Sequence, residues 1–310
     1  MTIGLRPAAT SRRASRGARR ALVAWGFSLP FALFFSVFML IPILSSLAMS
    51  FTDFTAVNVQ NPLAVDFVGL SQYVSVFSDG QFLSSLGVTA YFVVVGLPLT
   101  IGLALVLALA LNSGINRFRA FFRVGFYLPV VCSIVAIAVI WRFILQNDGF
   151  MNAMLSWFGI QGPNWLNSTT WAMPAMILMA VWRNTGTLMI IFLAGLQGIS
   201  PEMKEASALD GAGIWQRFIH ITLPLMRPTL LLGAVLTSVG YLQFFEEPFV
   251  MTNGGPLGST TSAAYYIFNQ FSFGKYGTAS AASYVLFIII ALISLVQFRA
   301  LRSNDSGGQS

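Results

Sequence analysis

Residues 200–224 read SPEMKEASALDGAGIWQRFIHITLP, and the interpretation of the whole chain turns on this polar connection between two apolar runs. Its first part carries the signals of a helix start. Ser200 suits the N-cap, Pro201 the first turn, and Glu202 the positive end of the helix dipole. Residues 203–209 favour helix formation. We therefore predict a short helix where hydropathy alone would leave a loop.

A break and a second short helix follow in the same connection. Asp210 and Gly211 interrupt the first helix, because glycine readily takes the left-handed conformation that ends helices. Residues 212–221 resume a helical pattern with apolar side chains partly on one face, and Pro224 is predicted to end it. Two short helices at an angle form a shape suited to docking a partner protein. An amphipathic segment lying on lipid is the alternative interpretation.

The rest of the chain has the composition of a membrane protein. Of its 310 residues, 56% are hydrophobic and only 9% are charged, and the mean hydropathy is +0.76. A soluble domain of this size carries about 25% charged residues. No soluble fold could bury so much apolar surface, so the predicted solvent is mostly lipid and the predicted fold class is all-α.

Six apolar stretches are long enough to cross a hydrocarbon core of about 30 Å as helices. We divide the chain into a cytoplasmic basic tail (1–24), a six-helix transmembrane domain (25–300) that contains the polar connection at 197–228, and a cytoplasmic C-terminal tail (301–310). The six predicted spans are residues 25–49, 83–111, 124–145, 171–196, 229–250 and 280–298.

The distribution of basic residues predicts the orientation in the membrane. Fourteen of the 17 Lys and Arg residues lie in the N-terminal tail, the second–third connection, the fourth–fifth connection or the C-terminal tail. On the opposite side only Lys275 lies clearly in a loop. Because basic residues accumulate on the cytoplasmic side, we expect both termini there. The arginine-rich tail is interpreted as an anchor to anionic lipid rather than a nucleic-acid binder.

Several chemistries are excluded by what the sequence lacks. A single cysteine, Cys132, rules out a disulfide framework and a multi-cysteine metal site. The only histidine, His220, rules out H-E-x-x-H, and it lies in a polar loop rather than at membrane depth. No G-x-x-x-x-G-K-[ST] loop is present. We therefore predict that the chain is not an enzyme, binds no metal and does not hydrolyse ATP.

The residues around the break resemble the cytoplasmic signature loop of ABC-importer permeases. The family pattern is E-A-A-x-x-D-G-A followed by F, I and P, and here Ser207 replaces the second alanine. The Asp-Gly-Ala form is similar to the carbohydrate-uptake branch, which segments 67–73, 192–197 and 252–256 also resemble, with Gln72 in place of Asn. The matching positions are Glu205, Ala206, Asp210, Gly211, Ala212, Phe218, Ile221 and Pro224.

The resemblance implies the type I permease fold of ABC importers, in the maltose-type or glycerol-3-phosphate-type group. ATP and Mg would be bound by a dimer of separate ATPase subunits, so this chain would hold no cofactor. The implied partners are that ATPase dimer, a second homologous permease, an extracytoplasmic solute-binding protein and the lipid of a bacterial inner membrane, with no nucleic acid. The expected function is the permease subunit of a binding-protein-dependent importer for a sugar or sugar-like solute.

The same resemblance assigns roles within the connection, which would be the coupling segment. Glu205 would contact the ATPase, Gly211 would permit the bend between the two helices, and Asp210 would cap or brace that bend. The predicted coupling residues are Glu205, Ala206, Asp210, Gly211 and Ala212.

Polar side chains at membrane depth are costly, so they are candidates for a solute pathway. Arg183 and Asn184 lie near the middle of the fourth predicted span. A structural pair between Arg183 and Glu246 or Glu247 is the alternative. The fifth span offers amide, carboxylate and aromatic groups, which suit sugars, and the resemblance places the sugar site of maltose-type permeases in these two spans. The predicted pathway residues are Arg183, Asn184, Thr237, Tyr241, Gln243, Phe244 and Glu247.

Two alternatives come from other classes of protein. A secondary transporter of a small polar solute would need coupling-ion groups near the midplane and commonly shows inverted repeats, and neither is evident. An intramembrane enzyme would need a catalytic pair of residues, and this sequence shows none. The solute itself is left open among a disaccharide, an amino sugar, glycerol-3-phosphate and a glycerophosphodiester.

Overall fold

The chain folds into helices, as its composition predicts. Apart from an isolated bridge between Thr52 and Phe67, the described part of the chain holds no strand. The predicted tail 1–24 falls almost wholly outside it. A computed structural model describes the protein except for residues 1–22, 24, 62–64, 114–117 and 306–310.

The elements follow one another in a simple order along the chain. A long first helix, Trp25–Met49, contains a π-helical stretch, Ser36–Leu40, and ends in α2, Ile41–Met49. A 3-10 turn, Ala56–Gln60, follows. The other helices are α3 (Ser71–Ser78), α4 (Gly80–Ser113), α5 (Arg119–Val131), α6 (Ile134–Ile144), α7 (Phe150–Ser156), α8 (Ala172–Gln197), α9 (Pro201–Leu209), α10 (Ile214–Arg217), η3 (Phe218–Thr222), α11 (Leu223–Leu242), α12 (Glu246–Met251), α13 (Ala263–Ser272) and α14 (Tyr276–Asp305).

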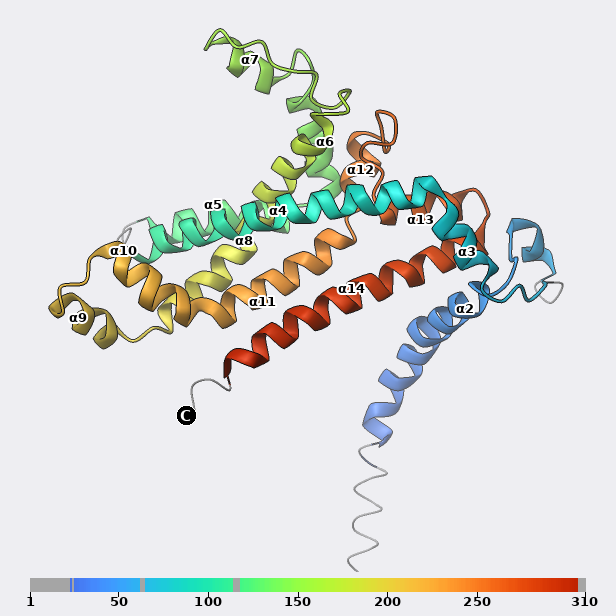
Figure 1. Ribbon diagram of the computed structural model, residues 1–310, viewed down its shortest axis with the longest axis horizontal. Coiled ribbons are helices and arrows are strands. Elements are labelled where there is room, and N and C mark those ends of the chain that lie inside the picture. Colours follow the sequence, from blue (N-terminus) through green and yellow to red (C-terminus); the bar gives the residue numbers. More distant parts are fainter. Residues whose placement is uncertain (1–22, 24, 62–64, 114–117, 306–310) are drawn as a thin grey trace, which may run out of the picture.

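Among the described residues, five helices are long and apolar enough to cross a membrane, and a bent pair of shorter helices is the sixth candidate span. The long helices α4, α8, α11 and α14 form one bundle, in which α4 packs most extensively against α8 (Figure 1). The connection with α9 and α10 lies at one end of this bundle, and α3 and α13 lie at the other. The four spans predicted at 25–49, 83–111, 171–196 and 280–298 agree with observed helices to within a few residues.

The third predicted span, 124–145, is not one straight helix. It consists of α5 and α6, which meet at an angle of 99°. Pro129 lies in the last turn of α5, and Cys132 has extended backbone angles that end the helix. Helix α6 then leads away from the bundle toward α7 (Figure 1). Hydropathy missed the bend because an apolar run reads the same whether it is straight or folded back.

The fifth predicted span, 229–250, is displaced at both ends. The second short helix of the polar connection does not stop at Pro224: α10, η3 and α11 form one continuous helix, Ile214–Leu242. The π-helical turn η3 ends two residues before the proline, which sits in the first turn of α11. There the altered bonding tolerates a residue without an N–H group. At the other end the helix breaks after Leu242, and α12 is a separate element.

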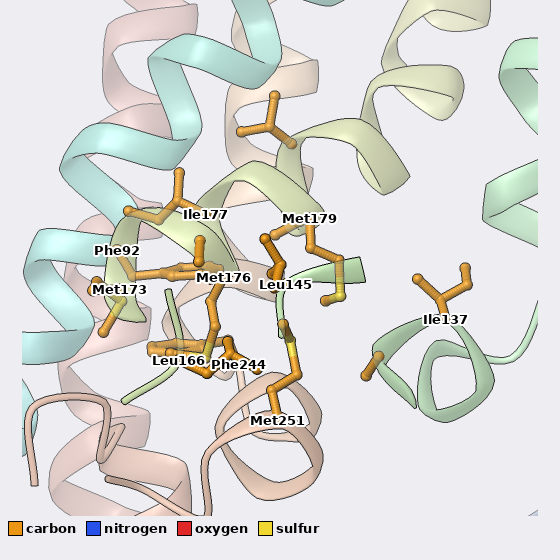
Figure 2. Packing of buried hydrophobic residues seen from close by; sticks show 14 of the residues in the cluster. Phe92, Ile137, Leu145, Leu166, Met173, Met176, Ile177, Met179, Phe244 and Met251 are labelled. Carbon is orange, nitrogen blue, oxygen red and sulfur yellow. The ribbon is translucent and has the colours of Figure 1, made fainter. Parts of the chain in front are cut away.

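Three buried clusters hold the described helices together, and one of them, around Phe82 and Tyr266, joins α3, α4, α13 and α14. The other two involve α8. One joins α4, α8 and α12 and includes Phe92, Met176, Phe244 and Met251 (Figure 2). The other joins α4, α8 and α11 around Phe192 and its neighbours. Flexible methionine side chains fill irregular gaps of this kind. The first helix contributes no residue to either cluster and none of its apolar window is buried.

Close helix packing in this bundle depends on small residues, as is usual in membranes. Helix α8 passes α5 at Gly186, where an added β-carbon would overlap the backbone carbonyl oxygen of Phe126. A backbone atom cannot move aside as the end of a flexible side chain can. The approach of these two helices therefore requires glycine at position 186.

We expect Gly186→Ala to lower the free energy of unfolding by about 1–3 kcal/mol, because the added methyl group overpacks the α5–α8 contact. Gly102→Ala in α4 is the matched control, since a β-carbon there meets no heavy atom within 4 Å. Thermal unfolding of the detergent-purified chain measures both. Equal melting temperatures for the two variants would contradict the inferred contact.

Candidate functional site

A cavity of about 300 Å³ lies between α8, α11 and the start of α12. Polar and charged side chains make up much of its wall. All seven residues predicted for a solute pathway lie around this one cavity, although their contact with a solute stays a prediction. They are Arg183 and Asn184 from α8, Thr237 and Tyr241 from α11, Gln243 and Phe244 from the break, and Glu247 from α12.

Helix α8 supplies the basic part of the wall. The side-chain amide of Asn184 donates to the carbonyl oxygen of Ala180 at 2.9 Å, one turn back along the helix. Arg183 Nη1 donates to Asn184 Oδ1 at 3.5 Å. Arg183 Nε is buried without a hydrogen-bond partner. Part of the donor capacity of the guanidinium group is therefore unused.

The break after α11 brings the remaining residues into the wall. A helix that stops at membrane depth leaves carbonyl groups that need a donor. The hydroxyl group of Ser262 donates to the carbonyl oxygen of Phe244 at 2.7 Å. The Ser262 hydroxyl oxygen also caps α13, because it accepts from the backbone N–H of Tyr265 at 3.0 Å. This serine stabilises the break, and α12 can start in a new direction with Glu246 and Glu247 in its first turn.

The acidic part of the wall lies in α12. Glu247 is only 4% exposed, and its Oε2 atom is buried without a hydrogen-bond partner. Glu246 and Glu247 line the same cavity as Arg183, yet among the described residues no ion pair joins Arg183 to either glutamate. The structural pairing that was an alternative role for Arg183 is therefore not formed in this structure.

The two aromatic residues of the wall are held from behind by α4. The Thr100 hydroxyl donates to the Gly96 carbonyl oxygen at 2.7 Å, so the Tyr241 hydroxyl, 2.7 Å from Thr100 Oγ1, acts as the donor between them. The ring of Phe244 stacks on that of Phe92, with 3.9 Å between centroids and 4° between planes. One face of Phe244 is thus covered by Phe92, and with only 3% of the residue exposed its ring belongs to the core beside the cavity.

Some residues of the cavity wall were not predicted from the sequence. Thr187 is one turn beyond Arg183 and Asn184 on α8, so helical spacing could have found it. Gly240 has no side chain, so no chemical argument from the sequence points to it. Ile134 reaches the wall only because α6 turns sharply away from α5, and no pattern in the sequence signals that bend.

We expect Thr100→Val to lower the free energy of unfolding by about 1 kcal/mol, because the buried Tyr241 hydroxyl loses its acceptor. Thr100→Ser keeps the oxygen atom and is the matched control. Unfolding of both variants in detergent, followed by tyrosine and tryptophan fluorescence, tests this. A serine variant as unstable as the valine variant would show that lost packing, not the hydrogen bond, is responsible.

The polar connection forms a second, separate feature at the end of the bundle. The hydroxyl oxygen of Ser200 accepts from the backbone N–H of Met203 at 3.4 Å, as expected of an N-cap. Helix α9 ends in a left-handed residue, Gly211, with φ of +77°. The Ala212 N–H donates to the Ser207 carbonyl oxygen at 3.0 Å, the bond that defines a Schellman cap. The predicted bend is therefore present, with glycine where the backbone requires it.

The side chains around this bend are open to solvent. Leu209 is 89% exposed and Trp215 is 74% exposed, an unusual position for large apolar groups on a polar segment. Glu205, Ala206, Asp210 and Gly211 are also exposed, whereas Ala212 is half-buried. The structure thus presents the predicted coupling residues at an accessible surface, while what they contact stays a prediction.

One helix connects the two features. The continuous segment Ile214–Leu242 has 29 residues, about 40 Å by helix rise. It starts three residues after Gly211 and ends beside the cavity, to which Thr237 and Tyr241 contribute. A single continuous helix therefore connects the bend with the cavity.

Comparisons with known proteins show which families and structures this architecture resembles. The family model described as binding-protein-dependent transport system inner membrane component matches residues 100–304. The lactose transport system permease protein LacF of Rhizobium radiobacter is 35% identical over 300 residues, which cover 95% of this chain and 99% of LacF.

Solved structures agree with the sequence relatives. The crystal structure of a bacterial ABC transporter involved in the import of the acidic polysaccharide alginate contains a chain with a TM-score of 0.81 and 25% identity, covering 94% of this chain and 99% of that one. A second crystal structure shows a bacterial alginate ABC transporter in complex with an alginate pentasaccharide-bound periplasmic protein. It contains a chain with a TM-score of 0.78 and 25% identity, and the match covers 91% of this chain and 94% of that one.

Proposed function

Because the chain belongs to the family of inner-membrane components of binding-protein-dependent transport systems, we propose that it forms half of the pathway for a sugar or sugar-like solute. In this role it is a translocation subunit and not an enzyme. The sugar class is supported by the name of the lactose permease relative and by the amide, carboxyl and aromatic groups around the cavity.

The observation that carries the proposal is the continuous helix Ile214–Leu242 between the exposed bend and the polar cavity. We assign the bend to docking on a separate ATPase, which binds the ATP and Mg that drive transport. Glu205, Asp210 and the neighbouring alanines Ala206 and Ala212 would form the contact surface. When the ATPase subunits close, the bend would move with them and the helix would reshape the cavity wall.

The remaining partners are assigned from the family and from the surface of the chain. A second, homologous permease would complete the pathway. An extracytoplasmic binding protein would deliver the solute, which is supported by the periplasmic protein bound to the similar alginate transporter. Both termini and the bend are assigned to the cytoplasmic side, because fourteen of the 17 basic residues lie in the tails and in the two connections on the same side as them, and basic residues accumulate on the cytoplasmic side.

Co-purification tests the proposed function directly. An affinity-tagged chain, extracted in mild detergent from its native membrane, is expected to bring down an ATP-hydrolysing subunit and a second permease in fixed stoichiometry. Mass spectrometry and an ATPase assay identify them. A chain that purifies alone, yet still transports solute after reconstitution, would be a secondary transporter and would overturn the proposal.

We expect Gly211→Val to leave the assembled complex intact but to cut solute uptake per ATP hydrolysed by at least tenfold. A β-branched residue at φ of +77° costs roughly 1–3 kcal/mol, which changes the angle of the bend. Gly213→Ala is the matched control, because its φ is −68° and its β-carbon would make only an ordinary 3.8 Å contact.

Glu205→Lys provides an independent test of the same surface. It reverses an exposed charge without altering the backbone, so the chain is expected to insert normally and to lose solute-stimulated ATP hydrolysis. Reconstituted proteoliposomes measure both uptake and hydrolysis. Normal coupling in the Gly211→Val, Glu205→Lys double variant would rule out the assigned role.

A further inference from the structure

A groove of about 570 Å³ lies between α2, α13 and α14, separate from the cavity beside Glu247. On α14 its lining residues are Tyr276, Ala279, Ser280 and Ser283, which follow the i, i+3, i+4, i+7 spacing of one helix face. The lining residues of α2, within 42–49, and of α13, within 264–271, follow the same spacing. The groove therefore runs along one face of each of three helices.

The surface inside the groove is almost entirely hydrocarbon. None of its lining residues, all of which belong to the described part of the chain, is charged. The hydroxyl group of Ser46 donates to that of Ser280 at 3.2 Å, and the Ser283 hydroxyl donates to the Ala279 carbonyl oxygen at 2.8 Å. These hydroxyl groups are already used within the protein, so an occupant of the groove must itself be apolar.

The length and direction of the groove match one leaflet of a bilayer. The lining residues of α2 and of α14 each extend over seven residue steps, about 10 Å by helix rise. One leaflet contributes about 15 Å of the hydrocarbon core. One end of the groove lies at Met49 and Tyr276, where α2 ends and α14 begins, at the end of the bundle opposite α9 and α10 (Figure 1). The groove therefore leads from this membrane surface toward the middle of the bilayer.

A positive charge lies in the chain at the same end. Lys275 directly precedes Tyr276 and is exposed, and no described carboxylate forms an ion pair with it. The sequence places no other Lys or Arg clearly in a loop on this side of the membrane. An apolar groove with an ammonium group next to its outer end is complementary to a phospholipid, which carries apolar chains below an anionic phosphate group.

Hydrogen bonds between two of the helices disfavour a helix of a partner protein as the occupant. Ser46 and Ser280 line the groove from α2 and α14 and are bonded to each other, and the Tyr284 hydroxyl donates to the Ile43 carbonyl oxygen at 2.6 Å nearby. A helix is about 10–12 Å wide, so it could not pass between α2 and α14 without breaking both bonds. An acyl chain is narrow and flexible enough to fill the groove beside them.

We propose that this groove binds an acyl chain of a phospholipid from the leaflet on the side opposite the bend, with the phosphate group at Lys275. The bound lipid fills the space between the first helix and the rest of the bundle. This helix has none of its apolar window buried by protein, so the lipid supplies contacts that the chain itself does not. The inference requires only that the chain spans a membrane, and it is independent of the transported solute.

Photocrosslinking identifies the occupant. Benzoylphenylalanine replaces Phe271, which lines the groove and is 58% exposed, or Phe287, which is 63% exposed on α14 outside the groove. The full chain, with the subunits that accompany it, is washed in detergent until loosely held lipid is removed, and is then irradiated. Intact-mass spectrometry is expected to show a phospholipid adduct at position 271 and only detergent at position 287.

Three results of this experiment would overturn the proposal. They are an adduct of position 271 with a protein, an adduct of position 271 with detergent alone, and phospholipid adducts of equal yield at both positions. The last result would show that lipid is retained over the whole apolar surface and not in the groove.

Substitutions test the two parts of the site separately. Lys275→Gln is expected to weaken the binding of added dioleoylphosphatidylglycerol by about fivefold, whereas Lys275→Arg keeps the charge and the affinity. Ala264→Trp fills the groove and is expected to abolish retention of the lipid. Ala90→Trp makes the same change at an exposed position of α4 and is expected to have no effect.

Native mass spectrometry measures the bound phospholipid, and the melting temperature in detergent reports whether each variant is folded. Unchanged binding in Lys275→Gln would overturn the assigned phosphate contact. Retention in a folded Ala264→Trp variant equal to that of Ala90→Trp would overturn the groove as the site. If Ala264→Trp does not fold, the photocrosslinking result at position 271 decides the location.

Discussion

A lipid bilayer offers the peptide backbone no water, so each N–H and C=O group at membrane depth must be bonded within the protein. This constraint explains why the chain is built from helices, and it makes any interruption expensive. The break after Leu242 exists because the Ser262 hydroxyl bonds the Phe244 carbonyl oxygen from a distant part of the sequence. That hydrogen bond lets a separate helix, α12, begin beside the cavity and carry Glu246 and Glu247 into its wall.

The break also separates the predicted fifth span into two elements, α11 and α12. On one side lies a continuous helix that reaches from the exposed bend at Gly211 to Tyr241. On the other side lies a short helix anchored in the core around Phe92 and Met251. The cavity lies between these two elements, so its shape depends on how the long helix is placed relative to α12.

The sequence predicted the parts that depend on local chemistry. Caps and glycine geometry located the bend, apolar length located the spans, and the cost of buried polarity singled out residues such as Arg183 and Glu247. The sequence did not predict the features that depend on the direction in which each helix runs. The 99° turn between α5 and α6 and the continuation through Pro224 leave hydropathy unchanged. The covered face of Phe244 depends on Phe92, which is far away in sequence and was not a candidate for any role.

The first helix, Trp25–Met49, takes no part in the buried clusters or in the cavity wall. It joins the remainder near its C-terminal end, where the Ser46 hydroxyl donates to that of Ser280 and the Ile43 carbonyl oxygen accepts from the Tyr284 hydroxyl at 2.6 Å. The segment matched by the family model, 100–304, starts well after it. Because none of its apolar window is buried, this helix needs few of its later neighbours in order to enter the bilayer, and insertion can precede their synthesis.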